Sequence, residues 1–157
     1  MSGIQRLEQM PVNPSAAECA NLRGEAEETA RLLAPMLETE VHGPEGEAVE
    51  IDRGIFLTVA ENLIGNAARF AQKKLEITLA LEKDRLLLTV ADDGPGFPPE
   101  LLKSVPKPFG KLEENAEHFG MGLYVSGLLC LKHGGGLRLE NRNGAAATAS
   151  FQIKRRS

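Results

Sequence analysis

The sequence predicts an α/β (α+β) two-layer sandwich, in which about three helices cover one face of a largely antiparallel mixed sheet. Two observations indicate this class. Stretches with helical apolar spacing alternate along the 157 residues with stretches in which every second residue is apolar. Two of the alternating stretches are divided by a short polar turn, as β-hairpins are. With 42% hydrophobic and 4% aromatic residues and no Trp, the chain can build one aliphatic core of single-domain size.

The N-terminal third of the chain predicts one long helix followed by an acidic segment. A helix from about Ser15 to Leu37 is expected from the spacing of its leucines and alanines, with Ser15 as the candidate cap. Residues 25–50 hold many glutamates and one basic residue, Arg31. This composition favours a solvated face over an acidic docking surface.

The next segment predicts a short strand, a second helix and a hairpin. EAVEI (47–51) can form the strand, and Asp52 then caps a helix that runs to about Ala71. Over residues 75–91, leucine, isoleucine and valine alternate with more polar positions on both sides of the break EKD. This stretch is expected to be a hairpin with one buried face.

A long irregular stretch precedes the last helix and the last hairpin. Residues 97–119 show no periodic segment of convincing length, and a loop of this size in a small domain predicts a functional lid. A third helix begins in GMGLYV (120–125) and ends in a glycine run. Residues 137–153 predict a second hairpin with NG as its turn, and the tail KRRS is too short to interpret.

The composition argues against several classes of protein. A net charge of −4 gives no overall positive field to attract nucleic acid. The two cysteines, Cys19 and Cys130, are far apart, which indicates reduced thiols in a cytosolic setting. No apolar run approaches the roughly 20 residues that span a bilayer, and no signal-peptide pattern is present. We expect a cytoplasmic domain without nucleic-acid or membrane contact, which is compatible with a membrane anchor elsewhere in a full-length protein.

Three short motifs carry chemistry. On the second helix Asn62 and Asn66 are one turn apart and share a face, whereas Glu61 is turned about 100° away from Asn62. In DDGPG, Asp92 ends a strand and two glycines let the backbone approach a ligand closely. In GMGL, two glycines bring bare N–H groups to a helix N-terminus, which suits a phosphate. A satisfied amide pair or an ordinary turn explains each motif alone, but their joint occurrence around a lid-sized loop predicts one shared site.

The full set of motifs resembles one protein family. Four motifs resemble the sequence motifs, called boxes, of the ATP-binding domain of sensor histidine kinases. They are NLIGNAARF (asparagine box), DDGPGF (first glycine box), KPFGK (phenylalanine box) and FGMGLYV with LKHGG (second glycine box). Sensor histidine kinases belong to a larger superfamily of ATP-binding proteins, which also includes gyrase-type topoisomerases, heat-shock chaperones and mismatch-repair ATPases. The resemblance covers about residues 20–154. It implies an α/β sandwich that holds ATP and Mg²⁺ between a helix and a mobile lid.

The resemblance implies a role for each matching residue. Asn66 would bind Mg²⁺ through its amide oxygen, and Asn62 would support that site or a bound water. Asp92 would accept a hydrogen bond from the exocyclic amine of adenine, which selects adenine over guanine. Asn62, Asn66 and Arg69 would be the catalytic residues. Arg69 would also reach towards the phosphates. The other residues expected at the nucleotide are Phe70, Gly94, Gly96, Phe109, Lys111, Gly120, Met121, Gly122, Leu123 and, on the rear strand near the adenine, Thr148.

Position 62 distinguishes branches of the superfamily. Members that hydrolyse ATP, and serine kinases of the anti-sigma type, typically have a glutamate four residues before the metal-binding asparagine as general base. This sequence has Asn62 there. The resemblance therefore favours transfer of the ATP γ-phosphate to a histidine, whose neutral imidazole is already nucleophilic. An anti-sigma-type serine protein kinase, or a nucleotide-binding module without catalysis, is the alternative.

The phosphoacceptor is expected in a separate domain. None of His42, His118 and His133 lies in an amphipathic helix followed by an acidic residue, as the family's acceptor does. The expected partners are a histidine-containing dimerisation domain and a response regulator. Residues 1–14 would be the end of the dimerisation helix or a linker, and residues 15–155 the catalytic domain. His118 replaces a glycine of the second glycine box, which would narrow or stiffen the lid hinge.

Overall fold

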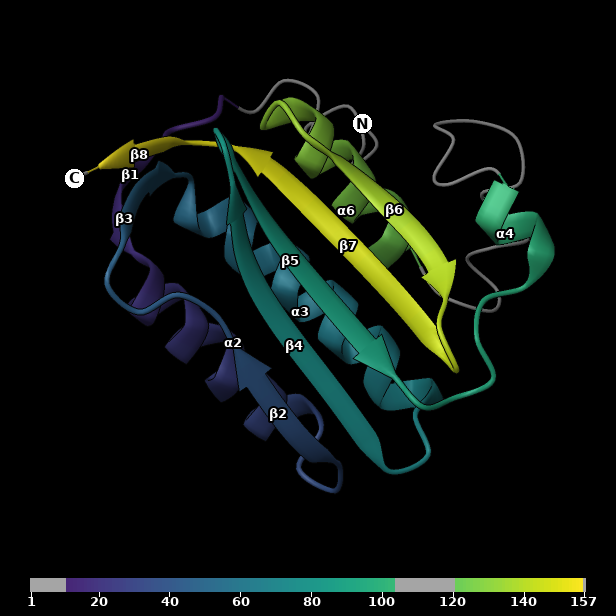
Figure 1. Cartoon of the computed structure of the whole chain (residues 1–157). Coiled ribbons are helices and arrows are strands. Elements are labelled where there is room, and N and C mark those ends of the chain that lie inside the picture. Colours follow the sequence, from purple (N-terminus) through teal and green to yellow (C-terminus); the bar gives the residue numbers. More distant parts are fainter. Residues whose placement is uncertain (1–10, 104–120, 157) are drawn as a thin grey trace.

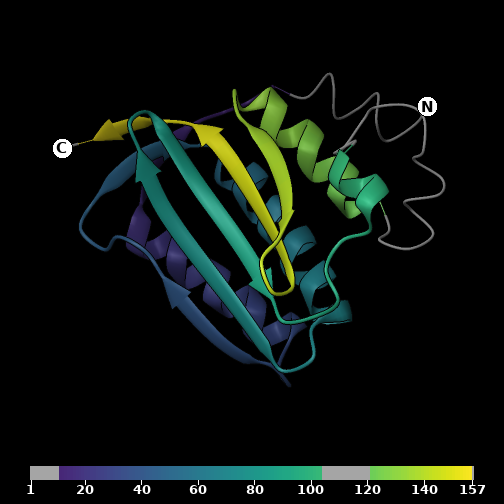
Figure 2. The same cartoon turned by 45° about the vertical axis from the view of Figure 1, so that its right-hand side comes forward.

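The computed structural model describes residues 11–103 and 121–156, which form two layers. In chain order the elements are β1 (Ser15–Glu18), α2 (Cys19–Leu33), β2 (Glu38–His42), β3 (Ala48–Ile51), α3 (Arg53–Phe70), β4 (Lys74–Glu82), β5 (Arg85–Asp92), α4 (Pro99–Lys103), α6 (Gly122–Lys132), β6 (Gly136–Asn141), β7 (Ala145–Gln152) and β8 (Lys154–Arg156). A five-stranded sheet has the order β2-β4-β5-β7-β6, and α2, α3 and α6 lie along one of its faces (Figure 1; Figure 2). A smaller sheet has the order β1-β3-β8. The two-layer sandwich is confirmed.

The main sheet is largely antiparallel, as predicted. β4 pairs with β5, β5 with β7 and β7 with β6, all antiparallel, and among the described strands only β2 pairs in parallel, with β4. Both predicted hairpins are present. The second one turns at Asn143 and Gly144, whose φ angles of 57° and 144° lie in the region that Asn and Gly tolerate best. The NG turn is therefore confirmed.

The predicted first helix begins too early and ends too late. Residues 15–18 form β1, which pairs antiparallel with β3, and α2 begins only at Cys19. The helix ends at Leu33, and Glu38–His42 form the edge strand β2, which the sequence did not predict. Both strands depend on partners more than 30 residues away, so tertiary pairing overrides the local helical propensity of SAAE. The tail, too, pairs with β3, as β8.

The predicted cap at Asp52 is confirmed and joins three parts of the chain. Its Oδ1 accepts the Ile55 N–H at 3.0 Å, which caps α3. Its Oδ2 accepts the Asn13 N–H at 2.9 Å, and its own N–H donates to Nε2 of His133 at 3.0 Å. His133, the C-cap of α6, is buried, and its ring is nearly perpendicular to that of Phe151 at a centroid distance of 5.6 Å. The segment before β1, the start of α3 and the end of α6 therefore meet at one residue, the first two at the Asp52 carboxylate and the third at its backbone N–H.

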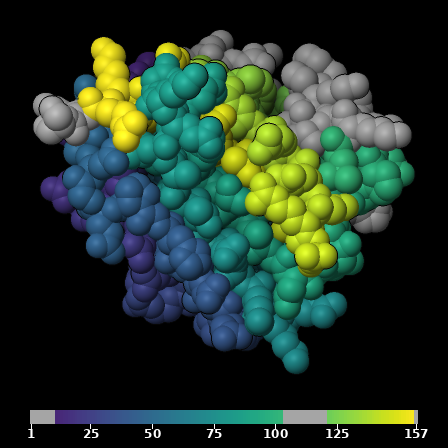
Figure 3. Space-filling view, in the orientation of Figure 1, coloured from purple at the N-terminus to yellow at the C-terminus, as the bar shows by residue number. Residues whose placement is uncertain are grey.

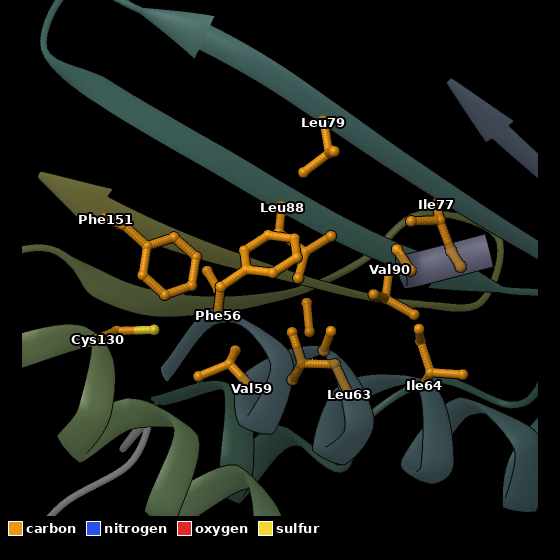
Figure 4. Close-up of a cluster of buried hydrophobic side chains, with 14 of the residues drawn as sticks. Phe56, Val59, Leu63, Ile64, Ile77, Leu79, Leu88, Val90, Cys130 and Phe151 are labelled. Atoms are coloured by element: carbon orange, nitrogen blue, oxygen red, sulfur yellow. The ribbon is translucent and has the colours of Figure 1, made fainter. Parts of the chain in front are cut away.

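The core lies between the sheet and the helices and is aliphatic, as the composition predicts. Figure 4 shows side chains of α3, including Phe56, Val59 and Leu63, packed against strand residues such as Leu88 and Phe151. All five are at most 2% exposed. Both cysteines, Cys19 and Cys130, are free and fully buried. Within the described residues, no helix is both long and apolar enough to cross a membrane.

The other face of the sheet is not covered by any described helix (Figure 3). Successive residues of a strand face opposite sides. On β7, Ala147, Ala149 and Phe151 belong to the core, so Thr148 faces the uncovered side. The strand register aligns Thr148 with Thr89. Residues 97–103 of the predicted lid contain the short helix α4, and the rest of the lid lies outside the described residues.

Candidate functional site

The second half of α3 places the two asparagines beside the N-terminus of α6. Asn62 and Asn66 are half-buried, whereas Glu61 is exposed, as the helical spacing predicts. Nδ2 of Asn62 donates to Oγ of Ser126, a fully buried residue of α6, at 3.2 Å. A Cβ added to Gly122 would lie 3.4 Å from Cβ of Asn62, so the glycine lets the helix start close to α3. Asn62 therefore lies at the contact between α3 and α6, and Asn66 lies one turn further along the same face of α3.

Asn66 has an acceptor without a partner. Its Oδ1 is buried and receives no hydrogen bond within the described part of the chain. A buried unpaired acceptor costs about 1–3 kcal/mol, so a site that keeps one is suited to an external partner. An amide oxygen is a donor atom that hard cations such as Mg²⁺ accept. Asn66 can therefore hold a cation or a water.

Asp92 lies at the end of β5, on the helix side of the sheet. Alternate residues of a strand share a face, so Asp92 lies on the same face of β5 as Leu88 and Val90, which belong to the core. Its Oδ1 accepts the Gly94 N–H at 2.7 Å, and the Ala145 N–H donates to the same carboxylate. Burial raises the pKa of Asp92, and these two hydrogen bonds oppose the rise. A half-buried carboxylate at a strand end can accept a hydrogen bond from a ligand.

The glycines after Asp92 permit two close contacts. A Cβ added to Gly94 would lie 2.3 Å from the carbonyl oxygen of Phe70, so the turn approaches the end of α3 closely. Gly96 has a φ of +90°, which favours glycine. The predicted reason for the glycines was approach to a ligand. The structure shows that they also let this turn contact α3 and the neighbouring strand end.

The residues at the end of α3 point outward. Arg69 is exposed, Phe70 is half-buried, and the guanidinium carbon of Arg69 lies 5.1 Å from the centroid of the Phe70 ring. This cation–π contact orients the arginine at the end of the helix that carries Asn66. Contacts of Arg69 with phosphate and of Phe70 with the nucleotide remain predictions.

The start of α6 has a mixed composition. Met121 is exposed at the N-cap, whereas Leu123 is buried in the core, and the predicted contacts of both with the nucleotide stay predictions. Gly122 begins the helix next to Asn62. The predicted site residues Phe109, Lys111 and Gly120, as well as His118, lie outside the described residues.

Thr148 does not lie where the sequence led us to expect it. Its side chain is on the uncovered face of the sheet, and its Oγ1 lies 3.1 Å from Oγ1 of Thr89. Asp92 is on the opposite face, so the structure does not bring Thr148 and Asp92 together. Because successive strand residues face opposite sides, an error of one residue in assigning the buried positions of a strand places a side chain on the wrong face of the sheet. Ala145, which donates its N–H to Asp92, is the β7 residue that lies beside the site.

Three further residues support the site and were not predicted. Ser126 holds Asn62, as described above. Asp93 accepts the N–H groups of Gln72 and Lys73, which fixes the turn after α3. Slight desolvation would raise the pKa of Asp93, but backbone hydrogen bonds outweigh it and lower the pKa. Asn141 binds the backbone of Phe97. These are non-local pairings between ordinary polar residues, and no motif marks them.

Comparison with known proteins places the site in a family. The family described as "Histidine kinase-, DNA gyrase B-, and HSP90-like ATPase" matches residues 51–157. Among curated proteins, sensor protein kinase CarS of Pseudomonas aeruginosa is 30% identical over 125 residues, covering 79% of this chain and 28% of CarS. Histidine protein kinase DivJ of Caulobacter vibrioides is 33% identical over 116 residues, covering 70% of this chain and 19% of DivJ. Sensor histidine kinase CpxA of Escherichia coli is 33% identical over 85 residues, covering 52% of this chain and 19% of CpxA.

Solved structures show the same fold. Full-length ShkA in complex with AMPPNP has a TM-score of 0.78 at 20% identity, over 98% of this chain and 34% of that one. The catalytic domain of histidine kinase ThkA has a TM-score of 0.71 at 24% identity, over 89% of this chain and 97% of that one. The chain thus spans between 19% and 28% of the three curated relatives above, and nearly the whole of the ThkA catalytic domain.

Proposed function

The chain belongs to the histidine kinase-, DNA gyrase B- and HSP90-like ATPase family, and from this premise we propose that it is the ATP-binding catalytic domain of a sensor histidine kinase. In this proposal the domain binds Mg-ATP and transfers the γ-phosphoryl group to a histidine on a separate dimerisation domain. A response regulator is the expected final acceptor. Because ATP is the substrate, the domain would act in the cytoplasm.

One observation carries the proposal: α3 presents two asparagines, and no carboxylate, on the face through which Asn62 contacts the start of α6. Asn66 offers a buried, unpaired Oδ1, and Asn62 is held by Ser126. Glu61, the nearest acid in sequence, is exposed and turned away. The site therefore offers oxygen donors for a metal-bound triphosphate but no base on this face of α3 to activate water or a serine hydroxyl.

The residues of this chain would divide the work between binding and orientation. Asp92 would accept a hydrogen bond from the adenine amine, and the N–H groups at the start of α6 would bind phosphate oxygens. Asn66, with Asn62 in support, would hold Mg²⁺, which when bound would neutralise charge on the triphosphate. Arg69 would approach the phosphates from the end of α3.

Transfer itself would need little covalent chemistry from this domain. The lone pair of a neutral imidazole attacks the γ-phosphorus, the bond to the bridging oxygen breaks, and ADP leaves. No proton has to be removed before the attack, because the free ring nitrogen is already unprotonated. Catalysis would then consist of positioning and charge stabilisation, which fits the absence of a carboxylate base on this face of α3.

Incubation with labelled ATP and a histidine-containing dimerisation domain tests the proposal. We expect transfer of label that is stable to base and labile to acid, as phosphohistidine is. Asn66→Ala should abolish it, and Asn143→Gly, a change in the β6–β7 turn at a φ of 57° that glycine adopts without strain, should not. Acid-stable label would favour the serine-kinase alternative. Tight Mg-ATP binding without any transfer would favour the non-catalytic module.

A further inference from the structure

Asn141, the last residue of β6, holds the backbone of Phe97 by two hydrogen bonds. Its Oδ1 accepts the Phe97 N–H at 2.8 Å, and its Nδ2 donates to the Phe97 carbonyl at 3.1 Å. The two residues are 44 positions apart. An amide side chain offers an acceptor oxygen and N–H donors in one plane, so it can pair with both the N–H and the C=O of a single residue, as a neighbouring antiparallel strand would. Asn141 is thus a side-chain clamp on the segment that follows Asp92.

The clamped segment and the β6–β7 turn are in direct contact elsewhere. A Cβ on Gly96 would lie 2.8 Å from Oδ1 of Asn141, and a Cβ on Gly144 would lie 1.9 Å from the carbonyl oxygen of Asp92. The Ala145 N–H also donates to the Asp92 carboxylate. The β6–β7 hairpin therefore contacts both ends of the segment. Gly144 and Ala145 lie against Asp92, and Asn141 binds Phe97.

The segment between these two points is Gly94-Pro95-Gly96, which has little stiffness of its own at its glycines. The Gly94 N–H is a hydrogen-bond donor to Oδ1 of Asp92, at 2.7 Å. Because these glycines do not fix the path of the chain, loss of the hold on Phe97 would let Gly94 move, and its hydrogen bond would no longer fix the orientation of the Asp92 carboxylate. The clamp at Phe97 is therefore mechanically linked to the direction in which Asp92 points.

We propose that Asn141 is a positioning residue for adenine recognition: it fixes the 94–97 segment so that Asp92 keeps the orientation that accepts the adenine amine. This inference rests on the proposed function, because it assigns a supporting residue to the same nucleotide site. Asn141 does not touch the nucleotide in this scheme. It acts through Phe97, Gly94 and Asp92 in turn, and its loss lowers adenine affinity and adenine selectivity together.

A matched set of variants of the whole chain tests the proposal. Asn141→Ala removes both hydrogen bonds. Asn141→Asp keeps the acceptor but sets a carboxylate oxygen against the Phe97 carbonyl, and it serves as the second variant if the alanine protein does not fold. Asn143→Gly is the control, because it lies in the same turn and its φ of 57° suits glycine. Mg-ATP and Mg-GTP affinities are measured by calorimetry, and amide exchange at Phe97 by NMR.

Both Asn141 variants should weaken ATP binding about tenfold, with a smaller effect on GTP, and Asn141→Ala, which removes the acceptor of the Phe97 N–H, should also exchange that amide faster. Asn143→Gly should match the wild type. In an Asp92→Asn background, Asn141→Ala should have no further effect on ATP affinity, because both changes act through one carboxylate. Unchanged ATP affinity in a folded variant, or full additivity with Asp92→Asn, would overturn the inference while leaving the proposed function standing. A wild-type chain that does not bind ATP would overturn both.

Discussion

Replacement of Asp92 by Asn should separate adenine recognition from folding. The substitution keeps the size of the side chain and one acceptor oxygen, but it removes the negative charge and adds an amide donor. In the proposed complex the adenine amine, itself a donor, would then face either a neutral oxygen or another donor. A hydrogen bond to a charged acceptor contributes about 1.5–3 kcal/mol, which corresponds to roughly 10–150-fold in affinity. We expect a loss of about 100-fold, because the adenine amine is also left without a good partner.

The same substitution should have little effect on the fold. Burial raises the pKa of Asp92, so its charged form is disfavoured in the folded protein, and a neutral Asn avoids that cost. Against this, the charged carboxylate accepts the N–H groups of Gly94 and Ala145, and an amide accepts them less strongly. The two effects have opposite signs. The melting temperature of the protein without nucleotide should therefore stay close to that of the wild type.

The pH dependence follows with a definite sign. Because the folded pKa is raised, the cost of the charged form is present above that pKa and is relieved as the pH falls through it. Protonation also removes the acceptor for adenine, so ATP affinity should fall on acidification at a higher pH than an ordinary aspartate would give. Asp92→Asn should lack this acid limb.

Calorimetric titration with Mg-ATP and Mg-GTP is the assay, and Asp93→Asn is the matched control. Asp93 is adjacent, but it binds the turn at Gln72 and Lys73 instead of facing the site, so its replacement should lower the melting temperature and leave ATP affinity within about threefold of wild type. A folded Asp92→Asn protein with wild-type ATP affinity would refute the role of Asp92. An equal loss in Asp93→Asn would show that the effect is not specific.

Three further substitutions probe the support of the site. Ser126→Ala removes the acceptor of Asn62 Nδ2 and should cost about 1 kcal/mol in urea unfolding, with non-additivity to Asn62→Ala in a double-mutant cycle; additive values would contradict the bond. Asn66→Ala removes a buried unpaired acceptor, so the melting temperature without ligand should not fall, whereas the Mg²⁺ dependence of ATP binding, compared in Mg²⁺ and in EDTA, should disappear. His133→Ala leaves the Asp52 N–H unpaired and opens a cavity beside Phe151, so it should lower the free energy of unfolding by about 2–4 kcal/mol. A loss below about 0.5 kcal/mol in urea unfolding would show that the hydrogen bond between His133 and Asp52 does not stabilise the fold.

The parts of the fold that the sequence could predict are those with strong local patterns. The hairpin of β4 and β5 alternates clearly and turns at a polar break, and α3 has both a cap at Asp52 and a long apolar face. The first-helix prediction failed because SAAE has no pattern that distinguishes a helix start from a strand, and its pairing with β3 is non-local. β2 and β8 were not predicted for the same reason, because each pairs with a strand far away in the sequence.

The candidate site was predictable where a motif occupies a few adjacent residues. Asn62, Asn66, Asp92 and Gly122 could be found this way, and the structure brings the asparagines to the start of α6 and Asp92 to the strand end near α3. Thr148 was misplaced because β7 reads AAATASFQ, in which small residues occupy both faces and the alternation does not reveal which side is buried. Ser126 and Asn141 were missed because their roles depend on partners 64 and 44 residues away.

The burial of both cysteines has a practical consequence for measuring the motions of this domain. Burial raises the pKa of the Cys130 thiol to about 12, and burial together with Glu47 raises that of Cys19. Thiolates are the reactive form, so neither sulfur should react with a maleimide dye near neutral pH. A cysteine introduced at Thr78, on the uncovered face of the sheet, would be the first accessible thiol among the described residues. A fluorescent label can then be attached to the introduced cysteine alone, without first replacing Cys19 and Cys130.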